Sequence, residues 1–281
     1  MNAEDRVTVP PIAFLGAGSM ARAILAGLLR PEVDAADIRA TNRSADKAAE
    51  LAADGVAAYA TETDASANRR AVAGAKLVVV AVKPAMVPDL LHEIADALEP
   101  GAVVVSVAAG VTVATFESIL PEHVSVVRTM PNTPAVVGRA VTGVSAGTRS
   151  TDGDLELVTA LFGTVGQVLV VPESQLDALS TISGSGPAYV FLLIEQLTAT
   201  AIDLGFTPEE AAIMVQGTFR GASELLAASG EEPAELRRRV TSPKGTTERA
   251  IAVLDEASLK QTFDRATQAA LARAKELAAG A

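Results

Sequence analysis

The sequence predicts an α/β protein with a doubly wound parallel sheet in residues 1–172 and an all-helical part in residues 173–281. Three observations support this division. Apolar, strand-like runs alternate with helix-like segments up to about residue 171. A glycine-rich turn joins the first of these runs to the first helix-like segment. Beyond Pro172 the strand-like runs stop, and alanine-rich segments with a period of 3.6 residues take over.

The glycine-rich turn follows the apolar run 11–15 and precedes apolar residues at helical spacing. Its pattern, Gly16-x-Gly18-x-x-Ala21, fits the dinucleotide-binding fingerprint. The first glycine would make the tight turn, and the second would let a pyrophosphate approach the backbone. Free N–H groups and the positive end of the helix dipole would then hold that anion. A purely structural turn before a helix has the same pattern.

The second expected strand begins at Ile38 and ends in the polar residues Asn42, Arg43 and Ser44, with Lys47 one turn into the next helix. A binder of NAD usually has an acidic residue here that holds the ribose 2′-hydroxyl. Donors and cations suit a 2′-phosphate instead, so the sequence favours NADP(H) over NAD(H). The alternative is that Ser44 merely caps the helix and Arg43 is solvated.

Further strands are expected at 76–82, 101–107, 123–128, 140–146 and 167–171, because these runs are apolar and rich in β-branched residues. A crossover helix is expected within 85–99, and another helix at 151–162. The polar or small residues after the strands at 76–82 and 101–107 would lie at the carboxyl edge of the sheet, where ligands bind in such folds.

The C-terminal part reads as a series of helices. A long apolar helix begins near Ala188, with Ser185 or Gly186 as its cap, and Thr207 opens the next helix with a capping box. Further helices are expected at 233–240, 246–255 and 258–279. Several are too apolar to stand alone in water, which predicts a homodimer at least. The loop 241–247 is either a cradle for a carboxylate or an ordinary N-cap turn.

The composition excludes several classes of protein. The chain has 281 residues, of which 49% are apolar and 20% are charged, and its net charge of −11 argues against a nucleic-acid partner. Cysteine is absent and the two histidines are far apart in sequence, so no metal site is expected. No run reaches the length of a membrane span. We therefore expect a soluble cytoplasmic protein without membrane contact.

Seven motifs together resemble the Δ1-pyrroline-5-carboxylate reductase family over essentially the full chain. These motifs lie at 16–21, 41–43, 81–84, 106–110, 128–134, 183–189 and 241–247. The first two recur in many dinucleotide-binding enzymes. The last two, Ser-Gly-Ser-Gly-Pro-Ala-Tyr and Thr-Ser-Pro-Lys-Gly-Thr-Thr, are specific in that order.

The resemblance implies a Rossmann-type domain followed by a helical dimerisation domain, whose dimers often form decamers in this family. It also implies reduction of 1-pyrroline-5-carboxylate to L-proline by NADPH, with NADH as a possible donor. The residues that it assigns to the cofactor are Gly16, Ala17, Gly18, Ser19, Met20, Ala21, Asn42, Arg43, Asn68, Val82, Lys83 and Ala109. The residues that it assigns to the substrate are Glu173, Ser242, Gly245, Thr246 and Thr247, with Thr247 catalytic through its hydroxyl on the ring nitrogen.

One residue departs from the family pattern, because Lys244 stands where the family often has the first of two glycines. Either backbone capture of the carboxylate is lost at this residue, or the lysine adds a cation. Two other functions are disfavoured. A β-hydroxyacid dehydrogenase would need a lysine on the helix within 183–204, which has none. A non-catalytic NADP(H) sensor would have no use for the loop 242–247. Reduction of a six-membered cyclic imine stays open.

Overall fold

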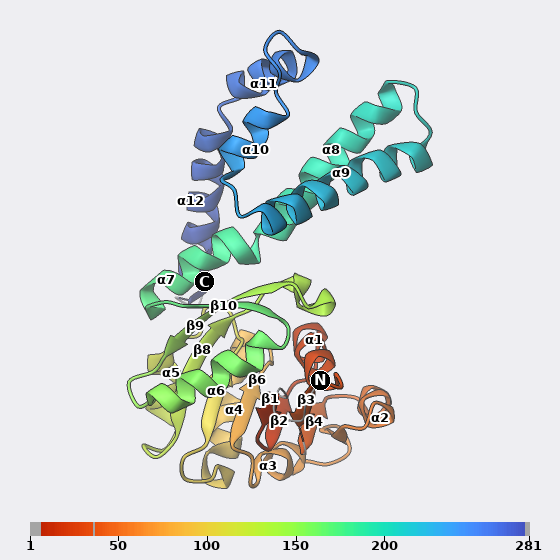
Figure 1. Cartoon of the computed structure of the whole chain (residues 1–281). Helices are drawn as coiled ribbons and strands as arrows, with labels where there is room; N and C mark the ends of the chain where they lie inside the picture. The colour runs from red at the N-terminus through yellow and green to blue at the C-terminus, as the bar shows by residue number, and fades with distance from the viewer. Residues whose placement is uncertain (1–6, 36, 279–281) are drawn as a thin grey trace. The chain divides into compact units, whose positions relative to one another are not determined.

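The computed structural model describes residues 7–35 and 37–278, coloured along the chain in Figure 1. It contains two compact units. The first consists of the described residues up to Ser185 together with those from Ala270 onward, and the second of Gly186–Ala269.

The first unit is built on an eight-stranded sheet with the order β10-β9-β8-β7-β6-β2-β4-β5. The strands are β2 (Ile12–Leu15), β4 (Ile38–Asn42), β5 (Ala57–Ala60), β6 (Leu77–Val80), β7 (Val103–Ser106), β8 (Ser125–Met130), β9 (Ala140–Ala146) and β10 (Gly166–Val170). Neighbouring strands are parallel except β8 and β9. The strand order reverses between β2 and β6, which is the point where ligands bind in open sheets of this kind.

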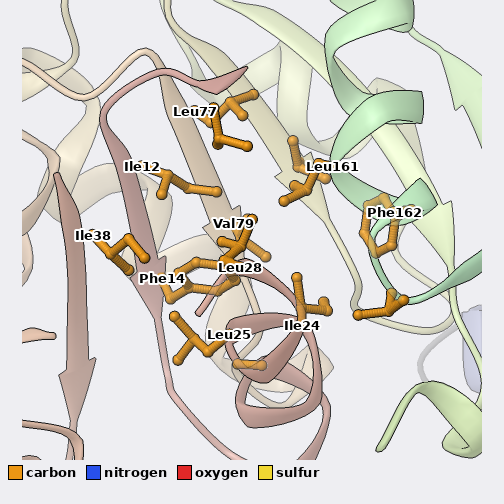
Figure 2. Close-up of a cluster of buried hydrophobic side chains, with 14 of the residues drawn as sticks. Ile12, Phe14, Ile24, Leu25, Leu28, Ile38, Leu77, Val79, Leu161 and Phe162 are labelled. Atoms are coloured by element: carbon orange, nitrogen blue, oxygen red, sulfur yellow. The ribbon is translucent and has the colours of Figure 1, made fainter. Parts of the chain in front are cut away.

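Helices pack on both faces of this sheet, as the alternation of side chains along β2 requires. Ile12 and Phe14 join an apolar cluster with α1 (Ser19–Leu28) and α6 (Asp152–Gly163), which Figure 2 shows in close-up. Ala13 and Leu15 join a second cluster with α3 (Ala67–Val72), α4 (Val87–Ile94) and α5 (Val113–Ile119). The remaining helical segments of this unit are α2 (Ala45–Ala53), η2 (Pro84–Met86), η3 (Ala95–Ala97), η4 (Thr133–Val137), α7 (Glu173–Leu179) and η5 (Ser180–Gly184).

The second unit is all helix. It comprises α8 (Gly186–Asp203), α9 (Pro208–Ser229), α10 (Pro233–Arg239), α11 (Thr246–Glu256) and the first part of α12 (Leu259–Ala278). The expected capping box is present, since Thr207 and Glu210 exchange side-chain and backbone hydrogen bonds at the start of α9. Large apolar side chains remain uncovered on this unit, including Phe191 at 65% exposure and Ile213 at 75%. Among the described helices, none combines the length and the apolar character needed to span a bilayer.

The structure confirms the α/β fold class and adds elements that the sequence did not predict. β1 (Val7–Val9) and β3 (Val33–Ala35) form a separate two-stranded sheet. The edge strand β5 reads Ala-Ala-Tyr-Ala, a composition that does not favour strands. Neither of the two expected N-caps is one, because Gly186 is already the first residue of α8 and Ser185 continues the preceding helix. The Ser185 backbone is right-handed helical, and its N–H bonds to the Ser180 carbonyl at the end of the π-helix η5.

Asp154 anchors the start of α6. Its carboxylate accepts hydrogen bonds from the Thr151 backbone N–H at 3.0 Å and from the Ser125 hydroxyl at 2.9 Å. Burial raises the pKa of Asp154, but the hydrogen bonds from Thr151 and Ser125 and the positive charge of Lys76 outweigh it, so the pKa lies below its usual value. A carboxyl group whose pKa is lowered by folding stabilises the folded state above its unfolded pKa.

We predict that Asp154→Asn lowers the free energy of unfolding by about 1–2 kcal/mol at pH 7, because the charged cap is lost. The difference from the wild type should shrink as the pH falls below about 4, where the unfolded carboxyl group is protonated. Urea unfolding at several pH values measures this. Asp152→Asn, an exposed change in the same turn, is the control. A difference that does not change with pH would contradict the prediction.

Candidate active site

The two glycines of the turn after β2 have different surroundings. Contacts within the protein require a glycine at the first position, whereas protein atoms leave the space beside the second unoccupied. Gly16 has a φ of +85°, and a Cβ placed on it would lie 2.7 Å from Val82 Cγ1. Gly18 is the N-cap of α1, and a Cβ on it would meet nothing closer than the Gly16 carbonyl oxygen at 4.0 Å. The space in front of Gly18 is therefore not used by protein atoms, as the fingerprint requires for a pyrophosphate.

The end of β4 holds this turn in place. The Thr41 hydroxyl accepts a hydrogen bond from the Gly16 N–H at 3.3 Å, and the Thr41 carbonyl accepts one from the Ala17 N–H at 2.8 Å. The Asn42 amide donates to the Ala17 carbonyl at 2.9 Å. Thr41 was not among the residues predicted to bind the cofactor, although it lies in the motif at 41–43, at the end of the strand. The expected contact of Asn42 with the ribose stays a prediction.

The first turn of α1 is suited to an anion. No side chain caps it, and it contains no acidic residue. The backbone N–H groups of its first turn, from Ser19 to Ala21, have no acceptor within the helix, and the positive end of the helix dipole lies there. These residues fit the pyrophosphate of a dinucleotide. Arg43 and Lys47, beyond the end of β4, are exposed, and neither has an ion-pair partner within the described residues.

A cavity of about 930 Å³ lies at the carboxyl ends of β6, β7 and β8 in the first unit. Two of the residues predicted to bind the cofactor, Lys83 and Ala109, line it. Its other charged lining residues are Asp177 and Arg273, and most of the rest are apolar or small. A largely apolar cavity with a few charged groups is suited to a planar ring and a small polar ligand.

A buried arginine ties this region together. Arg128 on β8 is only 3% exposed and donates to Asp177 Oδ1 at 2.7 Å and to Glu173 Oε1 at 3.2 Å. The same oxygen of Glu173 accepts the backbone N–H of Val113, the first residue of α5, at 2.8 Å. Glu173 thus joins α7 to β8 and α5, and it is not among the residues that line the cavity. Its contact with substrate stays a prediction.

The other two predicted cofactor residues have different surroundings. Val82 lies directly behind Gly16 and explains why only glycine fits there. Asn68 donates its amide to Glu93 Oε2 at 3.0 Å, which links α3 to α4. Asn68 does not line the cavity, and its contact with the cofactor stays a prediction. Within the described residues, no group of three histidine, aspartate or glutamate side chains is placed to hold a metal ion.

The predicted substrate loop forms a closed turn before α11 in the second unit. The Gly245 N–H donates to the Ser242 carbonyl at 3.0 Å, and a Cβ on Gly245 would lie 2.9 Å from that oxygen. Thr246 and Thr247 are the first two residues of α11, and no side chain caps this helix. Thr247 is half-buried. The loop therefore places hydroxyls and backbone N–H groups at the positive end of a helix.

Lys244 adopts a conformation that normally favours glycine, with a φ of +61°. Such a backbone costs a non-glycine residue about 1–2 kcal/mol. Its N–H donates to Glu248 Oε2 at 3.0 Å, so this donor is already used within the loop. The arrangement favours the alternative in which Lys244 contributes a cation instead of a backbone N–H.

The fold and the nucleotide site define a class, the NAD(P)-dependent oxidoreductases. Residues 11–110 match the family model described as "NADP oxidoreductase coenzyme F420-dependent", and residues 173–277 match "Pyrroline-5-carboxylate reductase dimerisation". A pyrroline-5-carboxylate reductase from Pseudomonas aeruginosa is 40% identical over 97% of this chain and 98% of its own length. A pyrroline-5-carboxylate reductase from Mycobacterium tuberculosis is 39% identical over 95% of this chain and 96% of its own length. The chain belongs to the pyrroline-5-carboxylate reductase family.

Solved structures agree with this assignment. The pyrroline-5-carboxylate reductase from Coxiella burnetii matches with a TM-score of 0.87 and 36% identity, covering 96% of this chain and 98% of that one. The pyrroline carboxylate reductase from Plasmodium falciparum, solved with NADP bound, has the same fold, with a TM-score of 0.81, 24% identity and coverage of 96% and 98%.

The comparisons confirm the resemblance, the oxidoreductase class and the expected homo-oligomer. The match to the dimerisation family begins at residue 173, whereas the two compact units of the structure divide after Ser185. The domain boundary at 172/173 stays a prediction.

We predict that Gly18→Ala weakens the binding of NADPH and NADH at least about tenfold, because the methyl group fills the space left for the pyrophosphate. The free energy of unfolding should fall by less than about 1 kcal/mol, since only a favourable N-cap residue is lost. Calorimetric titration and urea unfolding measure the two effects. Gly163→Ala, where a Cβ likewise meets no atom within 4 Å, is the control. Wild-type nucleotide affinity in Gly18→Ala would show that the glycine turn does not bind the pyrophosphate.

Proposed function

We propose that this chain reduces 1-pyrroline-5-carboxylate to L-proline with hydride from NADPH, and that NADH serves as an alternative donor. The observation that carries the proposal is the full-length match at 40% identity, together with the closed turn from Ser242 to Thr247 at the start of α11. In the reaction, the carbon of the C=N bond gains a hydride and the ring nitrogen ends with one proton, so that the imine becomes a secondary amine.

The nucleotide is assigned to the first unit. The N–H groups that follow Gly18 hold the pyrophosphate, and Arg43 with Lys47 holds the 2′-phosphate through charge-assisted bonds. Lys83 and Ala109 line the cavity that would receive the nicotinamide. When bound, NADPH supplies the hydride from C4 of its nicotinamide.

The substrate carboxylate is assigned to the second unit. The hydroxyls of Ser242 and Thr246 and the backbone N–H of Thr246 receive it at the start of α11, with the ammonium group of Lys244 nearby. Gly245 contributes by forming the tight turn, because its own N–H is bonded to the Ser242 carbonyl. The hydroxyl of Thr247 is within the same turn and contacts the ring nitrogen. Holding the carboxylate and the nitrogen at two points fixes the orientation of the ring within the loop.

This mechanism does not depend on a strong acid. A cyclic imine is basic enough to be partly protonated near neutral pH, and the iminium form accepts hydride without further activation. The protein must therefore mainly bring two carbon atoms together, and such positioning can lower a barrier by about 7–11 kcal/mol in favourable systems. Thr247 orients the nitrogen and hydrogen-bonds to the amine as it forms.

The assembly and the location of the protein belong to the same proposal. The uncovered apolar side chains of α8 and α9, such as Phe191 and Ile213, support burial against a second copy. We propose that the dimers associate further into decamers. We also propose that the protein is located in the cytoplasm, where reduced nicotinamide nucleotides are available.

The direct test follows the absorbance of NADPH at 340 nm after addition of 1-pyrroline-5-carboxylate. We expect NADPH to be consumed in a one-to-one ratio with proline formed. The six-membered cyclic imine, 2-keto acids and 3-hydroxy acids, the last with NADP⁺, serve as comparison substrates. The proposal fails if the five-membered imine is not reduced, or if one of the comparison substrates turns over faster.

We predict that Thr247→Ala lowers kcat about 10- to 100-fold. The variant loses one hydrogen bond to a charged group, and such a bond contributes about 1.5–3 kcal/mol. The affinity for NADPH should stay within about threefold, because Thr247 is assigned to the substrate. Thr247→Ser should restore most of kcat, since it restores the hydroxyl. Steady-state kinetics and nucleotide titration of both variants measure this. An unchanged kcat in Thr247→Ala would exclude Thr247 from the reaction.

A further inference from the structure

The side chain of Glu62 caps the N-terminus of α2, beside the expected position of the adenosine ribose. Ser44 is the N-cap of this helix, but its side chain makes no capping hydrogen bond. Glu62 takes that role from a different segment, because its Oε1 accepts the Ala45 N–H at 2.7 Å. The Glu62 N–H in turn donates to the Arg43 carbonyl at 3.1 Å. The segment after β5 thus lies across the loop that follows β4.

The same loop carries the groups that suit a 2′-phosphate. In this fold the adenosine ribose lies at the carboxyl end of the second strand beside the glycine turn, which here is β4. Arg43 and Lys47 are exposed there, and a helix N-terminus adds free N–H donors. Glu62 occupies one of these donors and places a negative charge among them.

The charges around Glu62 do not neutralise it. Within the described residues it has no ion-pair partner, whereas nearby Asp64 is paired with Arg70 at 2.7 Å. Asp46, in the first turn of α2, adds a second exposed carboxylate. The loop after β4 and the start of α2 thus carry two cations and one carboxylate, and Glu62 adds a second carboxylate where a phosphate monoester would add its own negative charge.

We propose that Glu62 sets the choice between the two nucleotides, and this inference rests on the cofactor assignment made above. Its carboxylate repels the 2′-phosphate of NADPH and competes with it for the Ala45 N–H. Toward NADH the same carboxylate accepts a hydrogen bond from the free 2′-hydroxyl, the role that an acidic residue has in many binders of NAD. The discrimination between the two nucleotides is consequently small in the wild-type chain.

The test compares the dissociation constants of NADPH and NADH for the wild-type chain and for Glu62→Gln, measured by calorimetric titration. Glutamine keeps an oxygen that can accept the Ala45 N–H, so the fold should be retained, which the melting temperature checks. We expect NADPH to bind about three- to tenfold more tightly in the variant and NADH to bind equally or up to about threefold more weakly. The gain for NADPH should shrink at high salt, because the charges are exposed.

Glu122→Gln is the matched control, since it removes the same charge from an exposed position before β8. Its NADPH and NADH affinities should stay within about 1.5-fold of the wild type, because Glu122 precedes β8 at the amino edge of the sheet and exposed charges are screened by salt. Equal changes for both nucleotides in Glu62→Gln, or no change, would overturn the role of Glu62 while leaving the proposed reaction intact. Failure of the wild-type chain to bind either nucleotide would instead overturn the proposed function.

Discussion

The position of the candidate nucleotide site depends on how tightly the chain turns after β2. Gly16 is confined by Val82 behind it, and its N–H donates a hydrogen bond to the Thr41 hydroxyl. No other residue fits, because its backbone is left-handed and its Cβ would clash. This constraint directs the start of α1 toward the carboxyl edge of the sheet. Everything assigned to the nucleotide is arranged around that edge.

A second constraint acts on the cavity. Arg128 is buried in the sheet, and its guanidinium is held by Glu173 and Asp177 from α7. Arg128 is buried but both carboxylates are partly exposed, so each pair is worth less than a fully buried one. Together they attach α7 to β8. Because Asp177 also lines the cavity, this ion-pair network shapes one wall of it. The Nε of Arg128 is buried without a hydrogen-bond partner within the described residues, a cost that the two ion pairs offset.

Much of the fold was predictable, because buried parallel strands and capped helices leave clear patterns. The runs at 76–82 and 101–107 contain β6 and β7, and the Thr207 capping box starts α9 as expected. The pairing of β1 with β3 was not predictable, since three-residue strands carry no periodicity. In the site, the glycine turn followed from spacing alone. The roles of Thr41 and Glu62 did not, because they depend on contacts between segments that the sequence leaves separate.

In the proposed reaction, a nucleotide bound at the glycine turn delivers hydride to the carbon of a cyclic imine. The most direct test uses NADPH carrying deuterium at both C4 positions together with 1-pyrroline-5-carboxylate. We predict that each proline formed contains one deuterium, on the ring carbon that belonged to the C=N bond. Proline without deuterium at that carbon, or oxidation of NADPH without proline, would contradict the account.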